Sequence, residues 1–103
     1  MYVIRLQLGE LDFTWDAAKH VANIRKHGVT FEDAATTWLD PLAIERADPA
    51  HSEREPRWLR IGSSLRGQLL VVWSGERQGR GRIVVRIIGA RRATPAEPNS
   101  GGP

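Results

Sequence analysis

The chain has 103 residues, of which 41% are hydrophobic and 26% charged, a composition that is ordinary for one small globular domain. It contains no cysteine, which excludes disulfides, thiolate metal ligands and cysteine nucleophiles. No segment approaches the about 20 apolar residues of a membrane-spanning helix, and the first residues lack a signal-peptide pattern. We therefore expect a cytoplasmic protein that makes no membrane contact.

The net charge of +3 reflects an arginine-rich set of basic residues, because 13 of the 15 are arginine. The planar guanidinium binds phosphate with paired hydrogen bonds and stacks on nucleic-acid bases. The arginine content therefore favours a nucleic acid or an acidic protein as partner. The codon usage of a GC-rich genome would account for it equally well.

The first third of the chain predicts a strand and then a helix. Residues 11–15 alternate in polarity as a strand does, and residues 1–10 are expected to add a short strand or an arm. Asp16 is placed to cap a helix over residues 17–27, and Gly28 is typical of the left-handed residue that follows a helix. The apolar face of this helix is expected to comprise Ala17, Ala18, Val21, Ala22 and Ile24.

A second helix is expected after Thr30, which is placed as its N-cap with Asp33 three residues later. Apolar residues recur from there at helical spacing. Pro41 ends the pattern, because proline disfavours helical geometry at the residue before it. The core-facing residues of this helix are expected to be Phe31, Ala34, Ala35, Trp38 and Leu39.

The remainder of the chain predicts strands separated by turn-forming residues. Strands are expected over residues 42–46, 57–63, 68–74 and 82–89, with a polar loop over 48–56. Because the last three follow one another through short turns, they are expected to form an antiparallel meander. The predicted fold class is therefore α+β, with two N-terminal helices packed on a small antiparallel sheet. Residues 1–94 are expected to form a single domain, and residues 95–103 a flexible tail.

The end of the first predicted helix carries Lys26 and His27, which are candidates for contacting phosphate or exchanging protons. The dipole at a helix C-terminus favours the cationic form of a histidine. Basic residues also complement a helix end without any further role, and this second interpretation stays open.

Arginines accompany the predicted strands and are candidates for holding a phosphate backbone. Arg82 and Arg86 are expected on one face of the last strand, whereas the apolar residues 83, 85 and 87, with Gly89, are expected on the other. An ordinary solvated sheet face would look the same. The chain has four tryptophans, Trp15, Trp38, Trp58 and Trp73. One of them is a candidate for stacking on a base, and Trp38 is expected in the core instead.

Glu76 and Arg77 follow a predicted strand and are candidates for a general base beside a phosphate-binding cation. The alternative is an ion pair in a turn.

No metal site is predicted. His20 and His27 lie about 10.5 Å apart along the helix, too far to share a zinc ion whose bonds are about 2 Å long. Asp48, His51 and Glu53 fall in a loop, where such residues more often form turn contacts. The chain also lacks a glycine-rich phosphate loop, so no cofactor is expected.

Seven segments, taken in order, resemble the BrnT family of bacterial toxins. The first two are residues 13–19 (Phe-Thr-Trp-Asp-Ala-Ala-Lys) and 23–34 (Asn-Ile-Arg-Lys-His-Gly-Val-Thr-Phe-Glu-Asp-Ala). The others are residues 39–43, 48–53, 57–62, 70–73 and 86–93. Each segment is short, but their order is specific and covers most of the chain.

The resemblance implies a compact RelE-like ribonuclease fold and a toxin that degrades RNA. It also implies a BrnA-like antitoxin encoded beside the toxin. The pair is expected to form a heterotetramer that binds operator DNA through the antitoxin.

We therefore expect a metal-independent RNA endonuclease toxin, in which the ribose 2′-OH attacks the neighbouring phosphate. The residues assigned to phosphate stabilisation are Arg66, Arg77 and Arg91, and those assigned to proton exchange are Glu76 or His27. The residues assigned to RNA contacts are Lys26, Arg82, Arg86 and Arg92. The alternatives are a non-catalytic module that binds nucleic acid or protein, and a degenerate toxin that only binds its antitoxin.

Overall fold

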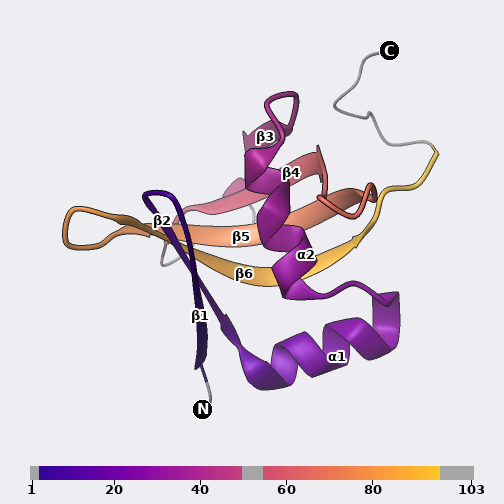
Figure 1. The fold of residues 1–103 in the computed structure, drawn as a ribbon, viewed down its shortest axis with the longest axis horizontal. Helices are drawn as coiled ribbons and strands as arrows, with labels where there is room; N and C mark the ends of the chain where they lie inside the picture. Colours follow the sequence, from indigo (N-terminus) through magenta and orange to yellow (C-terminus); the bar gives the residue numbers. More distant parts are fainter. Residues whose placement is uncertain (1–2, 50–54, 96–103) are drawn as a thin grey trace.

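The computed structural model describes residues 3–49 and 55–95, which form an α+β fold built on one six-stranded sheet (Figure 1). The strand order across the sheet is β1-β2-β6-β5-β4-β3. The strands are β1 (Val3–Leu8), β2 (Leu11–Asp16), β3 (Ile44–Ala47), β4 (Arg57–Ser63), β5 (Leu69–Gln78) and β6 (Ile83–Arg92). The helices are α1 (Ala17–His27), α2 (Phe31–Ala35) and the 3-10 helix η1 (Thr36–Leu39).

The sheet is mixed, so the expected small antiparallel sheet is wrong. β2 runs parallel to β6, with Leu11 opposite Ile83 and Thr14 opposite Arg86, and all other neighbours are antiparallel. The helices are also not N-terminal, because the hairpin of β1 and β2 precedes them. This hairpin pairs with the edge of β6 and so satisfies backbone groups that would otherwise be exposed.

α1 has the bounds that the sequence predicts. The Asp16 carboxylate accepts hydrogen bonds from the backbone N–H groups of Ala18 (2.8 Å) and Lys19 (3.1 Å), and Gly28 has a φ of 70°. These contacts satisfy backbone groups that a helix leaves open at its ends.

The face of α1 that turns inward is not the predicted one. Val21 is 48% exposed and Ile24 40% exposed, whereas Asn23 is buried. α1 lies beside the part of β6 that extends beyond β2 (Figure 1). There the Asn23 amide nitrogen donates to the backbone oxygen of Ala90 (2.8 Å), and the Ala90 N–H donates to the Asn23 Oδ1 (3.1 Å). A polar side chain is buried because a strand edge offers hydrogen-bonding groups that an apolar side chain leaves unsatisfied.

The second predicted helix is divided into α2 and η1. Thr30 caps it as expected, accepting from the Asp33 N–H at 3.1 Å. The hydroxyls of Thr36 and Thr37 donate to backbone oxygens three residues back, a contact that competes with regular helical bonding. Leu39 is consequently 54% exposed rather than buried. No helix in the described residues is long and apolar enough to cross a membrane.

The core lies between the helices and one face of the sheet. Its largest side chains include Phe13, Trp15, Phe31, Leu70 and Ile87, and Trp38 packs against it while partly exposed. β4 has the predicted bounds, β5 and β6 extend further than predicted, and β3 begins two residues later. Most of the expected tail, residues 96–103, lies outside the described residues.

A bulge in β6 changes which residues face the core. Trp73 pairs with Gly89 but Ser74 pairs with Ile87, so Ile88 is an extra residue in β6. Beyond this bulge Ala90 faces the core in place of the predicted Gly89. Gly89 and Arg91 consequently lie on the same face as Arg86, opposite the helices.

Candidate functional site

The sheet face opposite the helices, here called the open face, carries a row of arginines. Residues that pair directly across neighbouring strands project to the same face. One such row runs through five strands and consists of Arg5, Thr14, Arg86, Gly75 and Arg57. Because neighbouring strands are about 4.8 Å apart, each of the two arginine-to-arginine steps in this row spans about 10 Å.

Glu55 lies over Gly75, between two of these arginines. Its Oε1 accepts a hydrogen bond from Nη2 of Arg86 and lies 3.9 Å from Nε of Arg57. A Cβ atom at position 75 would lie 2.9 Å from the Glu55 carboxyl carbon, so only glycine leaves room for this arrangement. The structure therefore holds one carboxylate between two guanidinium groups.

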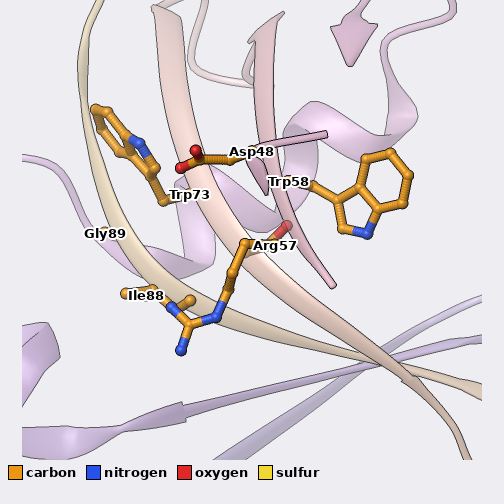
Figure 2. A pocket seen from close by; sticks show the side chains of 7 residues that line it. Asp48, Arg57, Trp58, Trp73, Ile88 and Gly89 are labelled. Carbon is orange, nitrogen blue, oxygen red and sulfur yellow. The ribbon is translucent and has the colours of Figure 1, made fainter. Parts of the chain in front are cut away.

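A hollow of about 280 Å³ adjoins this cluster. Its lining includes Asp48, Arg57, Trp73, Ile88 and Gly89 (Figure 2). The guanidinium of Arg91 lies 5.3 Å from the centre of the Trp73 ring. Figure 2 shows the ring of Trp58 on the other side of the strand from Trp73 and Arg57. Both tryptophans line the hollow, but the ring of Trp73 is the one on the same side of the strand as Arg57.

A second hollow lies along α1. It is lined by Lys19, Ala22, Asn23, Lys26, His27 and Ile88, and its volume is also about 280 Å³. Ile88 lines both hollows, so they meet at the β6 bulge.

The cluster has the groups that phosphodiester chemistry requires. Two guanidinium groups can hold a phosphate, a carboxylate can accept a proton, and an aromatic ring can stack on a base. Within residues 3–49 and 55–95, no three histidine, aspartate or glutamate side chains converge as metal ligands. His51 and Glu53, considered above, lie outside these ranges.

Comparison with known proteins decides the family. Residues 15–97 match the model of a family described as the ribonuclease toxin BrnT of type II toxin–antitoxin systems. The chain belongs to the BrnT family. Its fold is also similar to that of the Brucella abortus ribonuclease toxin BrnT, solved by crystallography at 1.1 Å resolution. That match has a TM-score of 0.53 and 23% sequence identity, and covers 78% of this chain and 92% of the Brucella chain. No curated protein matches.

Membership of the BrnT family makes the chain a ribonuclease toxin of the type II class, and such a toxin implies an antitoxin partner. Arg86, Arg91 and Arg77 all lie on the open face, but at different distances along it. Arg77 is two residues along β5 from Gly75, which pairs with Arg86, whereas Arg91 pairs with Val71 on the other side of Gly75.

Glu76 and Arg77 are not brought together in this BrnT-family chain. Successive residues of a strand project to opposite faces, and Glu76 pairs with the core residue Val85. Glu76 therefore lies on the helix-covered face and Arg77 on the open face.

Three further arginines selected from the sequence do not line either hollow. Arg66 is exposed in the turn between β4 and β5. Arg82 forms an ion pair with Asp12 at 2.7 Å and donates to the backbone oxygen of Gly9 at 2.8 Å. Arg92 approaches the α1 terminus, with its guanidinium 3.9 Å from where a Cβ of Gly28 would stand.

Sequence reasoning did not select Glu55 or Arg57 as site residues. The available signal was Gly75, because a glycine inside a strand often marks the close approach of another group. His27 and Lys26 were selected, and the structure places both in the hollow along α1.

Proposed function

We propose that this BrnT-family chain is a metal-independent RNA endonuclease whose active site is the Glu55 cluster on the open face. The observation that carries the proposal is the Glu55 carboxylate, held by Arg86 and beside Arg57, next to the hollow walled by Trp73. In this assignment Glu55 replaces Glu76 as the general base. Arg77 and Arg91 contribute positive charge from the same face.

In the proposed reaction, a phosphate enters between Arg57 and Arg86 and takes the Arg86 hydrogen bond and the Arg57 ion pair away from Glu55. The freed carboxylate then accepts the proton of the ribose 2′-OH, whose oxygen attacks the adjacent phosphorus. The bond from phosphorus to the 5′-oxygen breaks, and that oxygen receives a proton. The products are a 2′,3′-cyclic phosphate and a 5′-OH end.

Four further side chains complete the mechanism. The two guanidinium groups stabilise the negative charge that builds up on the phosphorane, which is the role a metal ion plays in other nucleases. Trp73 stacks on a base beside the scissile bond. His27, in the adjoining hollow, is the proton donor for the leaving 5′-oxygen.

The partner in this proposal is a BrnA-like antitoxin. An acidic segment of it would cover the arginine row and block RNA entry. The pair would assemble as a heterotetramer that binds operator DNA through the antitoxin. Family membership supports an antitoxin in general, and the charge of the open face supports an acidic contact.

The test combines expression with purified protein. Induced expression should arrest growth and deplete RNA, and co-expression of the neighbouring reading frame should restore growth. Purified protein should cleave a defined RNA in the presence of EDTA and leave cyclic phosphate and 5′-OH ends. Cleavage abolished by EDTA and restored by a divalent ion would overturn metal independence. Normal growth and intact RNA, with soluble protein present, would overturn the enzymatic proposal in favour of a binding module or a degenerate toxin.

A further inference from the structure

We propose that the hollow along α1 is an extended subsite that binds the phosphate backbone of the RNA strand next to the cleaved bond. The placement of that bond rests on the proposed function above, but RNA binding in the hollow does not. The strand would run from the Trp73 hollow, over Ile88, and along the side of α1.

The two hollows form one path because of the β6 bulge. Ile88 is the extra residue of the bulge and lines both hollows. β2 pairs with β6 only as far as Arg86, so none of the described strands pairs with this edge of β6 at Ile88. Asn23 fixes α1 beside this stretch through both backbone groups of Ala90, which gives the path a rigid wall.

The charge of the α1 hollow fits a polyanion. Among residues 3–49 and 55–95, its lining includes Lys19, Lys26 and His27 and no acidic side chain. Lys19 and Lys26 are seven residues apart, which is about 10.5 Å along the helix axis. Between them stands Ala22, whose small side chain leaves the path open.

The helix dipole does not explain both lysines. Basic residues at a helix C-terminus are favourable, which accounts for Lys26 and His27 in the last turn. Lys19, however, lies in the first turn, where the dipole disfavours a cation and favours the anionic N-cap Asp16 instead. A ligand that needs positive charge along the whole side of the helix accounts for Lys19 as well.

RNA is favoured over an acidic protein as the occupant. The path leads directly into the hollow with Trp73 and Arg57, where an aromatic wall and a guanidinium group stand together. Lysine ammonium groups bind phosphates as point charges, and phosphate contacts carry no base information. We therefore expect the subsite to be insensitive to base sequence.

The experiment measures RNA affinity against salt concentration. The probe is a fluorescently labelled single-stranded oligoadenylate of about 12 nucleotides. All measurements use the Glu55→Gln variant, which lacks the proposed general base and should therefore leave the probe uncut. Lys19→Gln and Lys26→Gln are added singly to this variant. Arg25→Gln is the matched control, because Arg25 is an exposed cation of the same helix that does not line the hollow.

Affinity falls as salt rises, and each lysine variant should make this fall shallower. The slope of log affinity against log salt should decrease in magnitude by about 0.7, the value for one lost phosphate contact on a single strand. Arg25→Gln should change it far less. A dinucleotide, which does not reach along α1, should lose less affinity than the long probe in the lysine variants.

Equal losses for Arg25→Gln and the two lysine variants would overturn the subsite, because they would indicate diffuse attraction to a basic surface. Unchanged RNA binding with weakened antitoxin binding would overturn it in favour of the protein partner. If the wild-type chain cleaves no RNA but the lysine variants still lose salt dependence, the proposed enzymatic function fails and the binding subsite stands.

Discussion

Glu55 and Arg86 form an ion pair on the open face although 31 positions separate them in the sequence. A second pair of the same kind, Glu45 with Arg60 at 2.8 Å, lies on the opposite face of the sheet. Arg60 also stacks on Trp38, with 4.3 Å between the guanidinium carbon and the ring centre. The two pairs share their chemistry but not their surroundings, because only the Glu55 pair adjoins the row of arginines and the Trp73 hollow. The second pair therefore supplies matched controls for the first.

Removing an arginine of the row should lower catalysis. Arg57→Gln and Arg86→Gln should each lower kcat/KM for RNA cleavage by about 100- to 1000-fold, because each removes a donor to the developing phosphorane charge. Arg60→Gln serves as the control, since Arg60 pairs with a glutamate in the same way on the other face. Steady-state cleavage of a labelled RNA measures all three variants. Equal activity in the Arg57, Arg86 and Arg60 variants would contradict the assignment.

Trp73 should contribute to substrate binding through its ring. Trp73→Ala should weaken RNA binding by about 1–3 kcal/mol, the usual value of one base stacked on an aromatic side chain. Trp73→Phe keeps a ring and should retain most of the affinity. Fluorescence anisotropy with a short single-stranded RNA gives both values. A phenylalanine variant as weak as the alanine variant would point to a packing role for Trp73.

Asn23 should be a stability determinant. Its amide donates to the backbone oxygens of Val29 and Ala90 and accepts from the Ala90 N–H, all within 3.1 Å and buried. Asn23→Ala leaves these groups unpaired and should lower the free energy of unfolding by about 3 kcal/mol. Urea denaturation measures the loss. Arg25→Ala, at an exposed position of the same helix, should change stability by no more than about 0.5–1 kcal/mol. Similar losses in both variants would argue against this role.

Arg82 should contribute mainly to stability, by holding the β1–β2 hairpin against β6. Its guanidinium joins Asp12 and the backbone oxygen of Gly9 to the start of β6. A double-mutant cycle with Arg82→Ala and Asp12→Ala should give a coupling energy of about 0.5–1 kcal/mol in unfolding, as for a partly exposed ion pair. A coupling energy of zero would show that the pair adds nothing to stability.

Local signals in the sequence predicted much of the secondary structure. Asp16 and Gly28 fix the ends of α1 through capping contacts that depend on only a few neighbouring residues. The prediction of the inward face of α1 was wrong because that face depends on β6, about 65 residues away. The backbone groups at the edge of β6 form hydrogen bonds with the polar side chain of Asn23. The periodicity of apolar residues carries no information about such an edge. For the same reason the parallel pairing of β2 with β6 was not predicted, since nothing local marks it.

The site was predicted less well than the fold. His27, Lys26 and the arginines of the open face were selected by residue type, and the structure places several of them beside one another. Glu55, the proposed general base, was not selected because it lies in a loop and its partner Arg86 comes from the last strand. Glu76 was favoured because it adjoins Arg77 in sequence, although adjacent residues of a strand face opposite ways.

The most direct test compares Glu55→Gln with Glu45→Gln. Both variants remove one carboxylate that pairs with an arginine, and both keep a side chain of the same shape. Glu55→Gln should lower RNA cleavage by the purified protein by about 100- to 10,000-fold, as expected for loss of a general base, and should abolish growth arrest at an unchanged melting temperature. Glu45→Gln should keep both activities. Full cleavage by the Glu55 variant, or equal loss in both variants, would contradict the assignment of the active site to the open face.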